Sequence, residues 1–423
     1  MRYDSLRLIV LLAVNNEDWM LRQIDFDAAY LNGVLQQTIY ARVPPGGLNV
    51  PGQPVAVKLI KTLYGLKQSG REWYEVLYRW LITYGFTSSN SDPCVFRMNN
   101  LVVGVYVDDC LLAGRETDIQ HFMTAAGDRF KFKDLGRPRL LLGLEFDYGD
   151  DGSVHLHQRT FAISVLRRYG MAQCNGRKTP LDPNSFPKRS TDAPVDLDRQ
   201  KNFQSIVGSV NFMAVVSRPD LSFTVGLLGS YNSNPSDTHL KLAHQVLRYV
   251  KGSIDTGITI TRSTSRMVTM YTDASFGLDP DNAKSFSGYV QQVSGSSVAW
   301  SSKRQGCVAK STHEAEYMAA SYAAAHLVWT RQALAELDSR EYKHRLLVDN
   351  QASITLMQDR KVNSKSKHIA VHYHFVRERF LQGEFMVEHV PSEDNLADIC
   401  TKALPLPTLR LLMEKITSNS SAD

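Results

Sequence analysis

Apolar and polar positions alternate along the chain in ways that predict different elements in different segments. The run from Leu6 to Val14 predicts a buried helix rather than a secretion signal, because it contains Arg7, continues into polar and acidic residues and has no convincing small-residue cleavage site. A second helix is predicted where apolar residues share one helical face, at Trp73, Tyr74, Leu77, Trp80 and Leu81. No run approaches the ~20 apolar residues of a membrane span.

Two adjacent acids interrupt the apolar segment Val103–Ala113. Asp108 and Asp109 stand between two short strand-like runs, which predicts a β-hairpin with both acids near its tip. Asp is a common turn residue, so an ordinary hairpin is one interpretation. A metal site is the other, because two neighbouring carboxylates repel unless a cation lies between them, and oxygen ligands suit magnesium.

The later part of the chain has a different order of elements. Residues 179–199 are rich in Pro, Ser and Asp and predict an exposed linker. Helices are predicted over residues 200–258. The last of them has a basic face, which is interpreted either as exposed to solvent or as a surface that contacts nucleic-acid phosphates. From residue 267 we predict a βββαβαβα order, with the final helix beginning near Asp394.

Composition narrows the class of protein without deciding its function. The chain has 423 residues, 43% of them hydrophobic and 22% charged, which is typical of two or three globular domains. A net charge of +5 is compatible with a polyanionic partner. The five cysteines include no C-x-x-C pair, so neither a disulfide framework nor a zinc knuckle is indicated, and a reducing intracellular setting fits best.

Asp25 is the candidate third ligand for a metal at the hairpin. It leaves an apolar strand and enters a turn, so it would lie beside Asp108 and Asp109 if the two strands were neighbours in one sheet. Three carboxylates with two magnesium ions are the arrangement that in-line phosphoryl transfer needs.

Several motifs with matching order and spacing resemble the reverse transcriptase of copia-type retrotransposons. They are Gln23-Ile24-Asp25, Ala29-Tyr30-Leu31-Asn32-Gly33, Val43-Pro44-Pro45-Gly46, Leu63-Tyr64-Gly65-Leu66-Lys67-Gln68, Tyr106-Val107-Asp108-Asp109 and Lys133-Asp134-Leu135-Gly136. The resemblance implies an α+β fold with a right-hand-like palm over residues 1–178, a helical thumb or connection over 200–266, and an α/β ribonuclease H-like domain with a mixed sheet over 267–423.

The resemblance also implies roles for particular residues. Asp25, Asp108 and Asp109 would be the catalytic, metal-binding polymerase triad. Tyr30 would exclude the ribose 2′-hydroxyl, with a plain core tyrosine as the alternative. The other residues expected at template or nucleotide are Gln68, Arg71 and Tyr106; Ser69-Gly70 replaces the family's more usual Ala-Pro beside them.

Four further acids look like the catalytic, metal-binding set of a ribonuclease H. They are Asp273, Glu316, Asp349 and Asp398. Two of them leave strands, one lies early in a long helix and one in the last predicted helix, so they are expected to meet. Any one alone reads as an ordinary turn or helix-end acid. Together they would repel strongly unless magnesium were bound.

His368 and His372 form an i, i+4 pair within a basic strip of residues 365–379. No acidic general base accompanies them in the zinc-protease arrangement, so a solvated or hybrid-contacting face is the preferred interpretation.

Two functions remain open at this stage. One is RNA-templated DNA synthesis and cleavage of RNA in RNA–DNA hybrids, with Mg²⁺, or alternatively Mn²⁺, as cofactor. The other is a truncated, polymerase-inactive remnant that binds nucleic acid and retains at most ribonuclease H activity, because the family's upstream fingers segment has no counterpart here. Expected partners are an RNA template, a DNA primer, the hybrid, deoxynucleoside triphosphates, and an upstream Pol segment or second chain. No membrane association is expected. The expected location is the cytoplasm or nucleus, without secretion.

Overall fold

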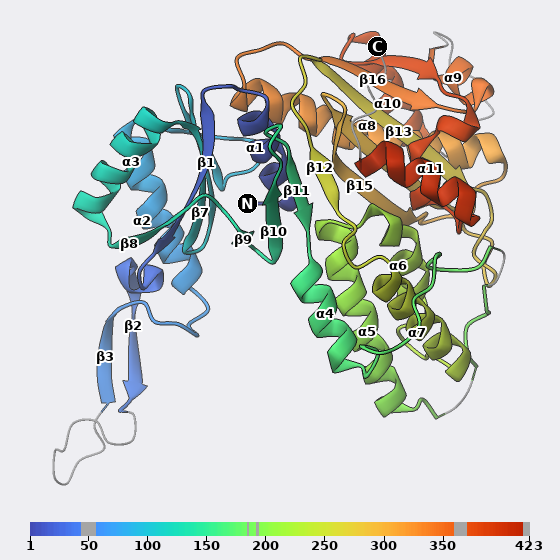
Figure 1. Cartoon of the computed structure of the whole chain (residues 1–423), viewed down its shortest axis with the longest axis horizontal. Coiled ribbons are helices and arrows are strands. Elements are labelled where there is room, and N and C mark those ends of the chain that lie inside the picture. The colour runs from blue at the N-terminus through green and yellow to red at the C-terminus, as the bar shows by residue number, and fades with distance from the viewer. Residues whose placement is uncertain (44–55, 184–185, 192–193, 359–369, 418–423) are drawn as a thin grey trace. The chain divides into compact units, whose positions relative to one another are not determined.

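The computed structural model describes residues 1–43, 56–183, 186–191, 194–358 and 370–417, without the side chains of 370–374. The chain divides into two compact units (Figure 1). The first comprises Met1–Ile9 and Asn16–Pro138, and the second comprises Val10–Asn15 and Arg139–Asp423. Helix α1 (Tyr3–Val14) contributes residues to both, and its apolar positions are buried, which confirms the first predicted helix.

A six-stranded antiparallel sheet in the order β4-β5-β6-β7-β1-β8 forms the centre of the first unit. Its strands are β1 (Trp19–Phe26), β4 (Thr87–Ser88), β5 (Val95–Met98), β6 (Leu101–Tyr106), β7 (Asp109–Arg115) and β8 (Phe132–Gly136). A short helix, η1 (Ala29–Asn32), follows β1, and β2 (Val34–Arg42) pairs with β3 (Ala56–Lys61) as a separate two-stranded sheet. The predicted hairpin is confirmed: β6 and β7 pair up to Tyr106 and Asp109.

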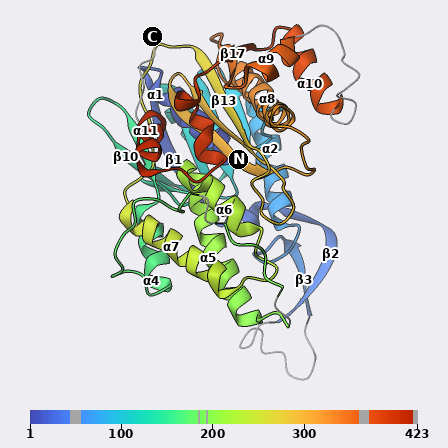
Figure 2. The same ribbon diagram turned by 90° about the vertical axis from the view of Figure 1, so that its right-hand side faces the viewer.

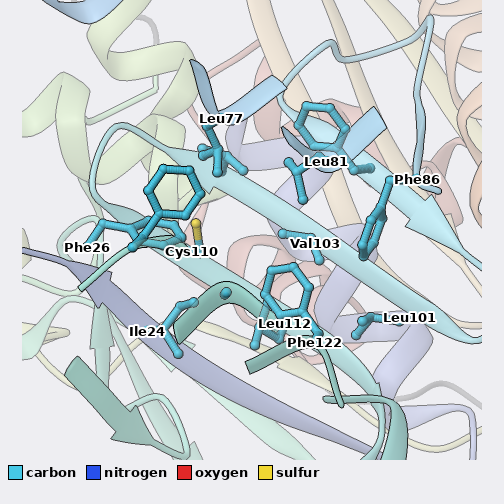
Figure 3. Close-up of a cluster of buried hydrophobic side chains, with 14 of the residues drawn as sticks. Ile24, Phe26, Leu77, Leu81, Phe86, Leu101, Val103, Cys110, Leu112 and Phe122 are labelled. Atoms are coloured by element: carbon cyan, nitrogen blue, oxygen red, sulfur yellow. The ribbon is translucent and has the colours of Figure 1, made fainter. Parts of the chain in front are cut away.

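Two helices, α2 (Ser69–Tyr84) and α3 (Glu116–Arg129), cover one face of this sheet. Alternate strand positions point into the shared core, among them Ile24 and Phe26 of β1 and Leu112 of β7 (Figure 3). On the other face, a Cβ at Gly104 would lie 2.8 Å from Ile9 Cδ1 of α1, so this glycine permits the helix to pack closely. Because alternation sends Ile24 and Phe26 to the core, Asp25 between them faces away from it.

The first part of the second unit joins a small sheet to a helical group. The sheet has the order β12-β11-β10-β9, from β9 (Leu140–Leu141), β10 (Leu144–Tyr148), β11 (Val154–His157) and β12 (Ile258–Ile260). The helices are α4 (Arg159–Arg168), α5 (Leu197–Val216), η2 (Pro219–Leu221), α6 (Ser222–Gly229) and α7 (Asp237–Gly252). The helical prediction for this region is confirmed.

The predicted domain boundary after residue 178 does not coincide with the division between compact units. The division falls at Pro138, because β11 pairs with β12 and thereby ties residues 139–178 to the chain that follows. The predicted linker, 179–199, has no regular structure in its described part before α5 begins at Leu197. It is mostly exposed, although Leu181 is buried.

A buried ion pair anchors the helical group. Arg218 Nη2 donates to Asp220 Oδ2 at 2.7 Å, and the two side chains are 3% and 0% exposed. Tyr249 Oη of α7 donates to the same carboxylate at 2.6 Å, while Arg218 Nη1 donates to the Ser253 carbonyl at 2.9 Å. The pair therefore connects η2 with the end of α7.

Removing one partner of this pair should destabilise the second unit strongly. In an Asp220→Ala chain the buried Arg218 guanidinium would have no counter-charge, so we expect a loss of about 3–5 kcal/mol in the free energy of unfolding. Urea unfolding followed by circular dichroism measures it. The control is Asp237→Ala, which removes the exposed partner of Arg199 and should cost no more than about 1 kcal/mol. Equal losses in the two variants would contradict the prediction.

A five-stranded mixed sheet forms the rest of the second unit, in the order β15-β14-β13-β16-β17. The strands are β13 (Met267–Ser275), β14 (Phe286–Val293), β15 (Ser296–Arg304), β16 (Lys343–Val348) and β17 (Met386–His389), and the helices are α8 (Thr312–Leu337), α9 (Gln351–Gln358), α10 (Ala370–Leu381) and α11 (Leu406–Thr417). Strands β13, β16 and β17 are parallel, and β14 and β15 are antiparallel to their neighbours. Helix α8 packs beside β13 (Figure 2). The predicted order of strands and long helix is confirmed.

The prediction of a final helix from about Asp394 is wrong. Residues Leu396–Cys400 form a short 3-10 helix, η5, whose first turn is capped by Asn395 Oδ1 accepting from the Ala397 amide at 3.2 Å. The α-helix begins only at Leu406, because Pro405 and Pro407 are tolerated at a helix start and not inside one. In the described part of the chain no helix is long and apolar enough to cross a bilayer.

Candidate metal-binding carboxylate sites

The first acidic site lies at the end of strands β1 and β7 in the first unit. Asp25 is directly paired with Asp109 across the two strands, and the Phe26 amide donates to the Asp108 carbonyl at 2.9 Å. The structure therefore brings together the three acids that the sequence singled out. Their ligand oxygens are not all within 4.8 Å of one another, in contrast to those of three acids in the second unit, described below.

A strained turn holds Asp108 at the hairpin tip. The turn consists of Val107 and Asp108, and Val107 has a φ of 58°. Such a value at the first turn residue favours Gly, and a β-branched residue there costs roughly 1–3 kcal/mol. Trp73 Nε1 of α2 donates to the Val107 carbonyl at 2.6 Å, and the Val107 side chain packs against the core. Packing from α2 thus fixes the turn that carries the acids.

Electrostatics at this site disfavour ionised carboxylates. Burial, with a contribution from Asp108, raises the pKa of Asp25, while Lys133 on the neighbouring strand opposes the rise. Burial also raises the pKa of Asp109, and Gln23 Nε2 opposes that rise by donating to Oδ1 at 3.1 Å. Gln23 belongs to the first motif and has no predicted role. Its position two residues before Asp25, on the same face of the strand, is the signal that could have placed it at the acidic site.

The predicted nucleotide and template residues all belong to the first unit. Tyr30 lies in η1 with its ring 4.7 Å from the ring of Tyr64. Gln68 immediately precedes α2, and Arg71 is exposed in its first turn. Tyr106 is exposed and paired with Asp109. Tyr64 has no predicted role, yet its ring contacts that of Tyr30, and burial and the charge of Asp108 raise its pKa.

The second acidic site is formed at the ends of parallel strands in the second unit. Thr272 of β13 is paired with Val348 of β16, so the residues that follow them, Asp273 and Asp349, lie side by side. Asp398 of η5 joins them, and one oxygen from each of the three carboxylates lies within 4.8 Å of the others. Three of the four predicted acids thus converge, although Asp398 comes from a 3-10 turn and not from the α-helix predicted for it.

Glu316, the fourth predicted acid, reaches the site from the second turn of α8. Glu316 is 5% exposed. One of its carboxylate oxygens accepts from the Ala274 backbone, and Oε2 has no hydrogen-bond partner among the described residues. Burial and the charges of Asp273 and Asp349 raise the pKa of Glu316. Burial and Asp273 likewise raise the pKa values of Asp349 and Asp398. The cluster is therefore short of positive charge.

Several supporting residues were missed at the sequence level. Thr401 Oγ1 donates to Asp273 Oδ2, and Ser392 Oγ donates to Asp349 Oδ2 at 3.2 Å. Lys402 Nζ lies 2.8 Å from Asp398 Oδ1 and 3.6 Å from Asp273 Oδ2. The spacing of Lys402, four residues after Asp398, was the available signal.

A glycine on β14 makes room for the segment that carries Asp398. Gly288 is paired with Asp273, and a Cβ there would lie 2.6 Å from Thr401 Cγ2 and 2.8 Å from Cys400 Cβ. A side chain at this position would therefore push η5 away from the sheet and displace its acid.

We expect Gly288→Ala to lower stability by about 1–3 kcal/mol through overpacking. Any nuclease activity should fall by roughly tenfold or more, because displacements of about 1 Å misplace reacting groups. Thermal unfolding and hybrid-cleavage rates measure the two effects. Gly306→Ala is the matched control, since no atom lies within 4 Å of its added Cβ. The prediction fails if both variants behave as the unaltered chain does.

One sequence-level hypothesis cannot be compared with the structure. His368 lies outside the described residues, and His372 is in α10 where side chains are not described. The described end of the basic strip includes Arg379, whose Nη1 contacts Glu384 Oε1 at 2.8 Å.

Comparison with known proteins identifies the family of this chain. A family model for reverse transcriptase (RNA-dependent DNA polymerase) matches residues 1–183. The retrovirus-related Pol polyprotein from transposon RE2 of Arabidopsis thaliana is 33% identical over 97% of this chain and 28% of its own length. A putative transposon Ty5-1 protein of Saccharomyces cerevisiae is 32% identical over 70% of this chain and 98% of its own length. The chain belongs to the copia-type retrotransposon Pol family.

The Pol chain corresponds to only a part of its longer relatives. It spans 28% of the RE2 polyprotein and 32% of the Pol polyprotein from transposon TNT 1-94 of Nicotiana tabacum. Among solved structures, LC11-RNase H1 isolated from compost matches 32% of the Pol chain and 93% of its own, at 18% identity and a TM-score of 0.27. LC11-RNase H1 in complex with an RNA/DNA hybrid matches with 20% identity and a TM-score of 0.24.

The second acidic site of the Pol chain fits a divalent metal. Its donors are carboxylate oxygens, which hard cations prefer, and three of them already converge. The unpartnered Oε2 of buried Glu316 is a further free acceptor beside them. A buried carboxylate oxygen without a partner is unfavourable, so a cation there would remove that penalty.

Proposed function

We propose that this Pol chain is an RNA-directed DNA polymerase and a ribonuclease H, with one activity in each compact unit. The observation that carries the proposal is the convergence of Asp273, Asp349 and Asp398, with buried Glu316 beside them. The pairing of Asp25 with Asp109 beside the strained hairpin turn supports the polymerase half. Two acidic sites in separate units fit a protein that both makes DNA and removes its RNA template.

In the polymerase site, Asp25, Asp108 and Asp109 would hold Mg²⁺, with Mn²⁺ as an alternative. Divalent ions there would supply charge stabilisation for both oxygens of an in-line displacement and would favour deprotonation of a primer hydroxyl. Gln23 holds Asp109 in place by its hydrogen bond, and Lys133 limits the accumulation of negative charge beside Asp25.

The aromatic and polar residues around the polymerase acids would position the substrates. The paired rings of Tyr30 and Tyr64 would form a wall beside the sugar of the incoming deoxynucleoside triphosphate and exclude a 2′-hydroxyl. Gln68 and Arg71, at the start of α2, would contact template and triphosphate. Tyr106 would pack against the primer end next to Asp109.

In the nuclease site, the four acids would hold the metal against an RNA phosphate. Metal ions there would supply an activated water and stabilise the leaving oxygen. Thr401 and Ser392 keep the carboxylates of Asp273 and Asp349 oriented through their hydroxyl hydrogen bonds. Glu316 would offer its free oxygen to the same site.

The remaining assignments follow from the family. Residues 1–178 would form the polymerase palm, 200–266 a thumb or connection, and 267–423 the ribonuclease H domain. The partners would be an RNA template, a DNA primer, their hybrid and deoxynucleoside triphosphates, with an upstream Pol segment or a second chain as a further partner.

Hybrid cleavage without DNA synthesis is a second candidate function. It is favoured by the difference between the two sites: among the described residues, Asp273, Asp349 and Asp398 have oxygens that all lie within 4.8 Å of one another, and the acids of the first unit do not. In that case the first unit would bind nucleic acid without extending a primer.

One experiment tests both candidates. A labelled DNA primer on a labelled RNA template is incubated with the chain and nucleotides, with Mg²⁺ and separately with excess chelator. Magnesium-dependent extension and RNA cleavage together would support the proposal, and cleavage alone would support the second candidate. If neither occurs with Mg²⁺ or Mn²⁺, both fail for this chain.

A further inference from the structure

A lysine, Lys402, contacts the acid cluster of the second unit. Lys402 Nζ lies 2.8 Å from Asp398 Oδ1 and 3.6 Å from Asp273 Oδ2, so one ammonium contacts two of the converging carboxylates. Its charge also stabilises the ionised forms of Glu316 and Asp349. Lys402 therefore contacts two of the four acids directly and acts on the other two only through its charge.

The backbone turn that carries this lysine is fixed by hydrogen bonds. The amides of Thr401 and Lys402 both donate to the Asp398 carbonyl, at 3.1 and 3.2 Å. The Thr401 hydroxyl is bound to Asp273, which ties the same turn to β13. The Lys402 side chain is 40% exposed, so it has a path toward solvent.

An ammonium and a divalent cation compete for the same carboxylate oxygens. Four neighbouring carboxylates repel one another, and a resident positive charge lowers that repulsion while no metal is bound. The oxygens that Lys402 contacts belong to two of the three acids that converge as a candidate metal site. A metal ion binding there must take over these contacts.

We propose that Lys402 is a resident counter-ion of the nuclease site, which holds the acid cluster together without metal and raises the concentration of Mg²⁺ needed to fill it. This inference rests on the proposed nuclease function, because it requires that the cluster bind metal. Lys402 is then a positioning residue that determines the Mg²⁺ concentration at which cleavage begins.

Metal titration of lysine variants tests this inference. The full chain is used in an Asp109→Asn background, so that the first unit contributes less to metal binding, and Mg²⁺ is titrated calorimetrically. We expect Lys402→Met to lower the half-saturating Mg²⁺ concentration at least about tenfold, since an uncompensated carboxylate cluster attracts a cation more strongly. The metal-free variant should also melt at a lower temperature and gain more from added Mg²⁺.

Two further variants separate charge from shape. Lys402→Arg keeps the positive charge and should titrate close to the unaltered lysine. Lys415→Met removes another lysine near the chain's end, which contacts Asp394 and not the cluster, and should leave Mg²⁺ binding unchanged.

The possible outcomes are distinguishable. Unchanged or weaker Mg²⁺ binding by Lys402→Met, with normal binding by the chain that keeps the lysine, overturns the counter-ion role while leaving the nuclease proposal intact. If the lysine-containing chain binds no Mg²⁺ at the second unit and cleaves no hybrid, the nuclease proposal fails as well.

Discussion

An Asp273→Asn chain should lose Mg²⁺-dependent cleavage of hybrid RNA by on the order of a thousandfold, the scale seen when one essential group of a catalytic site is removed. Asp273 is the central acid of the second site: it neighbours Asp349 through the strand register, and both Thr401 and Lys402 contact it. An amide keeps the shape of the side chain and removes the negative charge. Initial rates of RNA cleavage under saturating Mg²⁺ give the measurement.

A matched control separates this effect from a general loss of charge. Asp394→Asn removes an acid that contacts Lys415 and does not belong to the converging group, so its cleavage rate should stay near that of the unaltered chain. The Asp273→Asn chain should fold at least as well as its parent in the absence of metal, because one repelling charge is gone. Cleavage that persists at the parent rate after Asp273→Asn would rule out this acid as a catalytic residue.

An Asp109→Asn chain should lose primer extension by a similar factor while retaining hybrid cleavage. Asp109 of β7 is paired with Asp25 of β1, and its carboxylate accepts a hydrogen bond from Gln23, also of β1. Both strands therefore fix the position of this carboxylate. The amide would weaken metal binding at this site, and the second unit has its own acids. Extension of a labelled primer and cleavage of a labelled template, followed in one reaction, measure the two activities together.

Asp27→Asn is the control for the polymerase variant. Asp27 lies two residues beyond Asp25, but it contacts Lys133 at 3.4 Å and is not paired with the hairpin acids. Its substitution should reduce extension no more than a few fold, since an exposed ion pair contributes about 1 kcal/mol or less. Equal losses from Asp27→Asn and Asp109→Asn would argue against the assigned triad.

Local patterns were sufficient to predict much of this fold. The hairpin around Asp108 and Asp109 follows from apolar runs that flank two turn-forming residues, and α2 follows from the helical spacing of Trp73 and Leu77. The convergence of Asp273 with Asp349 was also predictable, because acids that follow parallel strands meet at one sheet edge. In each case the sequence pattern that allows the prediction lies within a few residues of the position that is predicted.

Features that depend on distant pairing or on competing local rules were not predictable in this way. The pairing of β11 with β12 joins residues about a hundred positions apart. The sequence near Pro138 therefore does not indicate that the two compact units divide there. The 3-10 turn at Asp398 arises because Asn395 caps a short segment and two prolines delay α11. From the sequence, Lys402 is interpreted as an ordinary solvent-exposed lysine. Only the fold shows that it contacts Asp273.

The position of η5 at one end of the sheet has a consequence for synthesis on the ribosome. Strand β13 brings Asp273 early, but Asp398, Thr401 and Lys402 are among the last described residues, and they pack against β14 where Gly288 leaves room. A nascent chain that has not yet released this segment contains the sheet without Asp398. The second acidic site would therefore be completed only after Asp25, Asp108 and Asp109 of the first site have already emerged.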